Sequence, residues 1–369
     1  MENFKIAIVI RAFNRGGAEV LLREMFESEE FKKKIKNWDF IILDSKLVEL
    51  LKDLKGNNTY VFNIFSSTFN TFFFEYYRLY KFIKLHNYKI IHAHLPNAGI
   101  VIRLLKFLLP KIKVVYTEHS IIEKYNRITY FLNGITYFKN DYTIFVSNDI
   151  REFVNKHKTP FFYWYGKGEV VLNGVNFNKY KCDSKINSTG RDYVTVGTVA
   201  SIRKVKRLDL WVQVAETFKR KFPHILIHFI IAGGGPEKKI VEELISLKKL
   251  GIFFELPGIV INTVSVYQNI DIFLMTSEFE GLPVALLEAR SCECVPITSN
   301  VGGIKYLNFS EFGYKYEEFN SDNIASIIYK YCNNRLMILE EGKKAREFII
   351  MNNGLNKQVE KYIDIYMSL

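Results

Sequence analysis

Short apolar runs alternate with stretches of helical periodicity along most of the chain, and this alternation predicts its architecture. In the first half the apolar runs lie at residues 4–10, 39–43, 59–63, 89–92, 113–117, 142–146 and 169–172, each with the length of a buried strand. Strands that alternate with helices indicate a parallel sheet with helices on both faces. Ligands bind such sheets beyond the carboxyl ends of the strands, so we expect chemistry in the loops that follow the strands.

The pattern is interrupted at residues 181–192, which are polar and lack periodicity. Apolar runs resume at residues 193–197, 225–231 and 272–275, and residues 322–369 are mainly helical in pattern. With 369 residues the chain is long enough for two cores. We predict a first domain over residues 1–178, a linker over 179–192, a second domain over 193–352, and a C-terminal helix over 353–369 that packs back on the first domain.

Composition adds a positive charge to this picture. The formal net charge is +12, with 48% hydrophobic and 24% charged residues. The excess of cations favours anionic partners, although a Lys-rich, AT-biased genome would produce the same balance. The four cysteines make no disulfide framework, which favours a reducing compartment. The first residues run directly into a strand pattern, and no apolar run approaches the roughly 18 residues of a spanning helix, so we expect a cytoplasmic, soluble or peripheral protein without a signal peptide.

The stretch over residues 277–289 carries the clearest candidate chemistry. It follows the apolar run at 272–275, and Pro283 lies where a helix would begin, because its fixed φ suits the first turn. Glu280 and Glu288 bracket that start. The free amides of a helix N-terminus attract anions such as a diphosphate. We therefore predict an anion-binding turn flanked by two carboxylates.

Other loops after strands allow two interpretations each. Gly16 and Gly17 would let a ligand approach the backbone closely or would form a plain turn, and they do not make the G-x-G-x-x-G pattern of NAD-binding proteins. The cations at residues 203–207 would neutralise a diphosphate or form a solvated charge run. The triple glycine at 233–235 lacks the Lys-Ser/Thr of a P-loop and is typical of a tight turn.

Histidines lie near two strand ends of the first half. We expect His92 and His94, two apart on a strand, to face opposite sides, which disfavours a shared zinc ion. Cys292 and Cys294 have no further ligands nearby in the sequence and are interpreted as reduced, packed thiols. His119 comes just past a strand end, where a structural role and a role in a ligand cleft are both open.

Residues 60–113 combine many aromatic and basic side chains with a single acid, Glu75. This composition suits a membrane surface with anionic lipids, and it also suits single-stranded nucleic acid. A core helix with a solvated lysine face is the plain alternative. A second aromatic cluster at residues 161–165 is predicted to pack on the same side. Of the two partners, we favour the membrane over nucleic acid.

Taken together, the ordered motifs resemble glycosyltransferase family 4 on a GT-B scaffold, over nearly the whole chain. The marks are Gly16-Gly17-Ala18-Glu19, Ile91-His92-Ala93-His94, Glu118-His119, Val146-Ser147, Asn173-Gly174-Val175, Val196-Gly197-Thr198-Val199 with Lys206, Ala232-Gly233-Gly234-Gly235-Pro236, Glu280-Gly281-Leu282-Pro283 with Glu288, and Gly302-Gly303. Their order and spacing are specific, above all the two glutamates separated by seven residues. The resemblance implies an α/β fold with two Rossmann-like domains facing a cleft.

The resemblance also implies a retaining glycosyltransferase that moves a hexose or N-acetylhexosamine from a nucleotide-sugar, expected to be UDP-linked, to a lipid-linked or polysaccharide precursor of a surface glycan. It places Gly16, Gly17, Ser201, Arg203, Lys206, Glu280, Gly281, Leu282, Pro283 and Glu288 around the donor. Glu288 would hold the ribose hydroxyls, Glu280 the donor sugar and Lys206 the leaving diphosphate. Glu280 and His119 would be catalytic, with His119 contacting sugar hydroxyls or assisting proton transfer. His94 and Asn97 would face the acceptor.

The implied reaction needs no cofactor or metal ion, and the sequence has no Asp-x-Asp pair that would hold one. The expected partners are the nucleotide-sugar, a lipid-linked acceptor and the inner face of the plasma membrane, without nucleic acid and with the oligomeric state left open. A sugar-nucleotide epimerase on the same scaffold and a non-catalytic glycan- or nucleotide-binding protein are the alternatives.

Three positions depart from the family pattern. Ser201 stands where an arginine is usual, and Arg203 is close enough in sequence to replace it. Glu293 stands where a glycine with positive φ usually ends the helix, which implies local strain or a different cap. Arg290 replaces a usually apolar residue on the same helix.

Overall fold

The computed structural model describes residues 5–12, 16–46, 58–65, 69–120, 125–181, 191–307 and 312–369. The chain divides into two compact units, one formed by Met1–Asn173 with Asn356–Leu369 and the other by Gly174–Leu355. Most of the predicted linker, residues 182–190, lies outside the described residues. Each unit is built on a parallel sheet with helices, which confirms the predicted α/β class.

The first unit holds a parallel sheet that has seven strands in the described part of the chain, in the order β3-β2-β1-β4-β5-β6-β7. These strands are β1 (Ile6–Ile10), β2 (Trp38–Ile42), β3 (Thr59–Val61), β4 (Ile90–His94), β5 (Lys113–Glu118), β6 (Tyr142–Phe145) and β7 (Lys167–Val170). All residues of β1 are buried, as expected of a strand covered on both faces. The carboxyl ends of β4 and β5 are neighbours, because His94 pairs with Thr117 in the register of the two strands.

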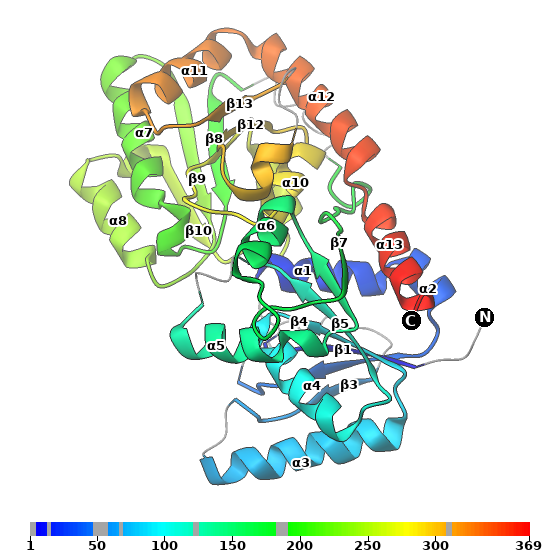
Figure 1. Ribbon diagram of the computed structural model, residues 1–369. Coiled ribbons are helices and arrows are strands. Elements are labelled where there is room, and N and C mark those ends of the chain that lie inside the picture. The colour runs from blue at the N-terminus through cyan, green and yellow to red at the C-terminus, as the bar shows by residue number, and fades with distance from the viewer. Residues whose placement is uncertain are drawn as a thin grey trace. The chain divides into compact units, whose positions relative to one another are not determined.

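The first unit contains helices that follow its strands and one helix from the end of the chain (Figure 1). They are α1 (Gly17–Glu27), α2 (Glu29–Lys34), α3 (Phe69–His86), α4 (Pro96–Leu108), α5 (Arg127–Thr136), the 3-10 turn η3 (Tyr137–Lys139), α6 (Asn148–His157) and, from the end of the chain, α13 (Leu355–Met367). Side chains of Asn126 and Ser147 accept hydrogen bonds from the backbone at the starts of α5 and α6. One core cluster joins the sheet to α3, α4 and α6 through residues such as Leu79, Ile102 and Val154.

The second unit repeats this architecture with a sheet in the order β10-β9-β8-β11-β12-β13. Its strands are β8 (Val194–Val199), β9 (Ile227–Ala232), β10 (Phe254–Gly258), β11 (Ile272–Met275), β12 (Val295–Ser299) and β13 (Tyr314–Tyr316). Its helices are α7 (Leu208–Lys221), α8 (Lys238–Leu247), α9 (Thr263–Asn269), α10 (Val284–Ser291), α11 (Ser321–Asn333) and α12 (Arg335–Asn352), with 3-10 turns η5 (Lys204–Lys206), η6 (Gly251–Phe253) and η7 (Gly302–Tyr306). Among the described residues, no helix has the length and apolar character needed to cross a bilayer.

The two departures on and after α10 have distinct physical forms. Glu293 adopts φ 59°, so the positive-φ position expected there is present and a side chain occupies it. That conformation is strained for a residue with a Cβ. Arg290 is fully buried, with its guanidinium 4.6 Å from the ring centroids of both Phe312 and Phe348. Burial lowers the pKa of Arg290 to about 9.

Candidate functional site

A compact polar group in the second unit is centred on the Glu280 carboxylate. Lys206, in η5, forms an ion pair with Glu280 Oε1 at 2.5 Å. The Ser277 hydroxyl donates to the same oxygen at 2.6 Å. Glu280 is 8% exposed, so the lysine and the hydroxyl compensate a largely buried charge. The structure thus brings together Lys206 and Glu280, which lie 74 residues apart in the sequence.

Backbone contacts hold the two loops of this group in place. The Glu278 amide donates to Val205 O at 2.9 Å, and the Thr276 hydroxyl donates to Lys206 O at 3.1 Å. Ser299, at the end of β12, donates its hydroxyl to Ser277 O at 2.7 Å. The ends of β11 and β12 and the η5 turn are therefore tied together around the carboxylate.

The predicted glycine turn at Gly302–Gly303 supports the backbone of Glu280. Gly302 has φ 54°, and a Cβ there would lie 1.6 Å from Glu280 O. The Gly303 amide donates to Gly281 O at 2.6 Å. Only a glycine fits at residue 302, because both the positive φ and the close backbone approach exclude a side chain.

Glu288 lies on α10 and is 5% exposed. The hydroxyl of Tyr267, from α9, donates to Glu288 Oε2 at 2.8 Å. Burial, followed by the charge of Glu288, raises the pKa of Tyr267 well above its ordinary value, so this tyrosine remains a donor. Tyr267 is a site residue that the sequence did not reveal, because α9 carries no motif.

The remaining predicted donor residues of this unit lie around the same loops. Pro283 is the N-cap residue of α10, which begins at Val284, one position later than the first-turn placement predicted from the sequence. Leu282 is buried and Gly281 is half-buried. Ser201 is half-buried in the loop after β8, whereas Arg203 is exposed at the start of η5.

A second polar group, in the first unit, contains three histidines from the ends of β4 and β5. The rings of His92 and His94 have centroids 4.0 Å apart. The prediction that they face opposite sides is wrong, because side chains alternate along a strand and residues two apart share a face. His94 Nδ1 lies 3.1 Å from His119 Nε2, at hydrogen-bond distance. Within the described residues, no group of three or more His, Cys, Asp or Glu side chains is arranged to hold a metal ion.

These imidazoles are neutral at neutral pH. Burial lowers the pKa of His92 and His94 well below the ordinary value, and it lowers the pKa of His119 to about 4. His119 keeps a partly exposed side chain, whereas His92 and His94 are fully buried. A neutral ring both donates and accepts a hydrogen bond, so each of these histidines acts as a polar contact rather than as a cation.

The C-terminal helix α13 contacts this histidine group. The Tyr366 hydroxyl lies 2.6 Å from His92 Nδ1, and Thr117 Oγ1 lies 2.7 Å from His92 Nε2. The ring of Tyr362 lies 5.3 Å from the His92 ring. This observation bears out the expected packing of α13 on the first domain. It also adds a hydroxyl contact that no motif indicated.

Glu118 precedes His119 and lies in a buried network of its own. Tyr125 and Tyr116 donate their hydroxyls to the carboxylate, the latter at 3.2 Å. Burial raises the pKa of Glu118 to about 7, although the tyrosine donors and the charge of Arg103 act in the opposite direction. The guanidinium of Arg103 lies 4.8 Å from the Tyr116 ring centroid. This carboxyl group precedes His119 in the chain, and its hydrogen-bond partners are tyrosines rather than the histidines.

The other predicted residues of the first unit lie at helix starts. Gly16 is the N-cap residue of α1, with φ −81°, and Gly17 is the first residue of that helix. The preceding residues 13–15 lie outside the described part of the chain. Asn97 is half-buried in the first turn of α4, three residues after His94. Gly16, Gly17 and Asn97 therefore make no part of the histidine group shown by the hydrogen bonds above.

Two family descriptions match the chain. Residues 181–349 match the family described as Glycosyl transferases group 1, and residues 48–179 match Glycosyltransferase Family 4. Both matches agree with the resemblance inferred from the motifs.

The individual proteins to which the chain is similar differ in how much of the chain their similarity covers. A poly(ribitol-phosphate) alpha-N-acetylglucosaminyltransferase of Staphylococcus aureus (strain COL) is 26% identical over 189 residues, or 50% of this chain and 38% of that protein. The chain thus spans about two fifths of the length of that relative. A UDP-Gal:alpha-D-GlcNAc-diphosphoundecaprenol alpha-1,3-galactosyltransferase of Escherichia coli is 26% identical over 320 residues, covering 79% of this chain and 78% of that protein. The fold is similar to that of Anabaena HepE in complex with UDP-glucose, with a TM-score of 0.84, 16% identity and coverage of 99% of this chain and 100% of the other.

Proposed function

The chain belongs to glycosyltransferase family 4, with the group 1 glycosyltransferase region in its second half, and we propose that it transfers a hexose or N-acetylhexosamine from a UDP-sugar to a surface-glycan precursor. The observation that carries the proposal is the Lys206–Glu280–Ser277 group, held by the Gly302–Gly303 turn. The names of the similar proteins support a UDP-sugar donor, because one is a UDP-galactose-dependent transferase and another was crystallised with UDP-glucose.

In this proposal the second unit holds the donor. Lys206 moves its ammonium from Glu280 to the diphosphate and neutralises the charge that develops as the nucleotide leaves. Glu280 keeps the Ser277 hydroxyl as a partner and accepts hydrogen bonds from the sugar. Glu288, oriented by the Tyr267 hydroxyl, accepts hydrogen bonds from the ribose. A fixed carboxylate acceptor suits ribose hydroxyls because it needs no rearrangement when the donor binds.

The first unit supplies the acceptor side and His119. As a neutral imidazole, His119 contacts a hydroxyl of the reacting sugar. Its Nε2 atom lies at hydrogen-bond distance, 3.1 Å, from Nδ1 of His94. The acceptor hydroxyl attacks from the face on which the diphosphate departs, so the anomeric configuration is retained. The hydroxyl proton passes to the departing diphosphate. This sequence of steps uses no metal ion, because Lys206 supplies the positive charge.

The acceptor we propose is lipid-linked, which would bring the enzyme to the cytoplasmic face of the membrane as a peripheral protein. The support is the E. coli relative, whose name includes a diphosphoundecaprenol-linked sugar, and the cationic, aromatic composition of residues 60–113. If the acceptor is instead a polysaccharide without a lipid link, the enzyme would transfer the sugar to it equally well in the absence of lipid.

The proposal is tested by measuring UDP release from UDP-glucose, UDP-galactose and UDP-N-acetylglucosamine, together with the thermal shift that each donor causes. Glu288→Gln should abolish the shift and lower UDP release by at least 100-fold. Glu243→Gln is the matched control, because Glu243 is an exposed carboxylate on α8, outside the loops that hold the group. Full activity of Glu288→Gln would overturn the site assignment. Release of an epimerised free sugar would point instead to an epimerase, and a thermal shift without turnover would point to a binding protein.

A further inference from the structure

Large apolar side chains are exposed on four neighbouring parts of the first unit. Helices α4 and α5 lie side by side, with η3 following directly after α5 (Figure 1). The exposed apolar residues are Leu104, Phe107 and Leu108 of α4, Ile128 and Phe131 of α5, Phe138 of η3, and Phe161 and Trp164 of the loop at residues 159–165. We call this set the α4–α5 surface. Phe161 is 86% exposed and Ile128 is 72% exposed, so these side chains do not contribute to the core.

The elements of the α4–α5 surface are bound to one another. The loop is closed by an antiparallel bridge between Thr159 and Phe162, and the Tyr163 amide donates to Gly134 O of α5 at 2.9 Å. Phe107 and Phe138 have ring centroids 6.2 Å apart. The elements that carry the exposed residues are therefore fixed to one another by these contacts.

Cations accompany these apolar residues, and acids are absent from the same segments. Residues 96–108, 127–139 and 156–168 contain no Asp or Glu. The Lys139 ammonium lies 4.1 Å from the Phe107 ring centroid, and the Lys158 ammonium lies 4.6 Å from that of Trp164. Arg127 and Lys111 are exposed at the margins of the surface. The surface thus places positive charge close to exposed aromatic rings.

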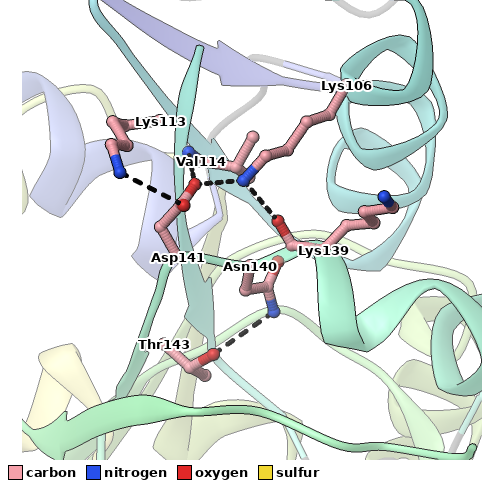
Figure 2. A network of polar contacts seen from close by, with 7 residues as sticks. All are labelled: Lys106, Lys113, Val114, Lys139, Asn140, Asp141 and Thr143. Atoms are coloured by element: carbon pink, nitrogen blue, oxygen red, sulfur yellow. Dashed lines mark hydrogen bonds and ion pairs between the residues drawn. The ribbon is translucent and has the colours of Figure 1, made fainter. Parts of the chain in front are cut away.

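Asp141, the acid closest in sequence to Lys139, is already paired from within the protein. Its carboxylate accepts from the Val114 amide at 2.7 Å and forms ion pairs with Lys106 and, at 3.7 Å, Lys113 (Figure 2). Lys106 also donates to Lys139 O at 3.1 Å. Figure 2 shows the Lys139 ammonium directed away from Asp141. The charge of Lys139 is therefore left for the α4–α5 surface.

We propose that the α4–α5 surface docks onto an anionic lipid bilayer. This inference rests on the proposed function, because docking would bring the enzyme to a lipid-linked acceptor. Aromatic rings and lysines occupy the boundary between headgroups and acyl chains, while Leu, Ile and Phe tips enter the apolar layer. Binding of single-stranded nucleic acid relies on planar rings that stack on bases, a role that exposed aliphatic tips such as Ile128 and Leu108 do not fill. The proposed surface shares α4 and the aromatic cluster at residues 161–165 with the membrane side predicted from the sequence, and it adds α5 and η3.

The experiment measures co-sedimentation of the full chain with vesicles of phosphatidylcholine alone and with 30 mol% phosphatidylglycerol, at 50 and 300 mM salt, without nucleotide-sugar. We expect binding to the anionic vesicles only, weakened by salt, because each lysine or arginine near an anionic surface contributes about fivefold. An apolar variant, Phe131→Ser with Phe161→Ser, and a charge variant, Lys111→Gln with Arg127→Gln, should each lower the partition coefficient at least tenfold. Ile252→Ser with Leu247→Ser, which removes exposed apolar residues of the second unit, should leave it unchanged.

The outcomes separate this inference from the proposed function. The inference is overturned if the wild-type chain does not bind vesicles, or if both variants bind them as well as the wild type does. UDP release is measured separately and tests the proposed function. Binding without any UDP release supports the surface and contradicts the enzyme. Tight binding of a single-stranded RNA oligonucleotide that is lost in the charge variant, without vesicle binding, would assign the surface to nucleic acid instead. A dimer in size-exclusion chromatography that both variants disrupt, without vesicle binding, would assign it to a second copy of the chain.

Discussion

Replacing Glu118 by glutamine should make the protein more stable at alkaline pH and less sensitive to pH. Burial raises the pKa of this carboxyl from 4.5 to about 7. The unfolded chain loses the proton near the lower value, whereas the folded chain holds it up to the higher one. Because the folded state binds more protons between these values, its stability falls as the pH rises from about 4.5 through 7. Glutamine resembles the protonated acid and carries no such penalty.

The size of the effect follows from the two pKa values. The difference between 4.5 and about 7 corresponds to about 3 kcal/mol of unfolding free energy, at about 1.4 kcal/mol per pKa unit. Part of this gain is lost again, because an amide is a weaker acceptor than a carboxylate for the Tyr125 and Tyr116 hydroxyls. We therefore expect Glu118→Gln to exceed the wild type by about 1–3 kcal/mol at pH 8 and by close to nothing at pH 5.

The assay is urea unfolding of both proteins from pH 5 to 8.5, with the difference in unfolding free energy plotted against pH. The histidines also contribute to the pH dependence, since a pKa lowered by burial makes the folded state less stable below about 6.5, but they do so equally in both proteins. Glu169→Gln is the control, because Glu169 also accepts from a tyrosine hydroxyl, at 3.0 Å from Tyr142, on a partly exposed strand. A difference that stays constant with pH, or a Glu118→Gln protein less stable than the wild type at pH 8, would refute the reasoning.

Three further changes test particular contacts. Tyr366→Phe removes the hydroxyl 2.6 Å from His92 and should lower the free energy of unfolding in urea by about 1 kcal/mol. It should also lower the kcat of transfer and change it more than the KM for the donor. Unchanged stability and kcat would show that the contact is incidental. Gly302→Ala places a Cβ against Glu280 O and should lose more than 2 kcal/mol of stability together with the donor-induced thermal shift; a wild-type shift would contradict the support assigned to this turn. Glu293→Gly relieves the side chain at φ 59° and should stabilise the protein by about 0.5–1 kcal/mol, so a loss of that size would show that the side chain is used elsewhere.

The sequence predicted most central strands and both edge strands of the first sheet, near residues 59–63 and 169–172, but it missed the two edge strands of the second sheet. Central parallel strands are covered on both faces, so their sequences are continuous apolar runs such as Ile6–Ile10 and Ile272–Met275. The edge strands Phe254–Gly258 and Tyr314–Tyr316 are half-buried and contain polar residues, and Phe254–Gly258 also contains a proline. Such short segments have no pattern that distinguishes them from loops.

Candidate loops were predictable, but the side chains that complete them were not. Motif residues such as Lys206 and Glu280 were singled out because their loops follow strands, and the topology then brings them together. Tyr267 and Tyr366 come from helices without a motif, and Tyr366 lies 274 residues from the histidine it contacts. Only the three-dimensional packing of α9 and α13 identifies these partners. The predicted facing of His92 and His94 was wrong, because residues two apart on a strand share a face.

The two polar groups differ in how they carry charge, and this difference constrains the proposed chemistry. In the second unit a lysine and a carboxylate lie 2.5 Å apart and compensate each other, so the group is ionised yet nearly neutral before a ligand arrives. In the first unit the imidazoles are kept neutral by burial, so they bring no positive charge of their own. A diphosphate would consequently be drawn to Lys206 rather than to the histidines. Its arrival would leave Glu280 with Ser277 as partner, which frees that carboxylate to accept from the sugar at the step where the bond to the diphosphate breaks.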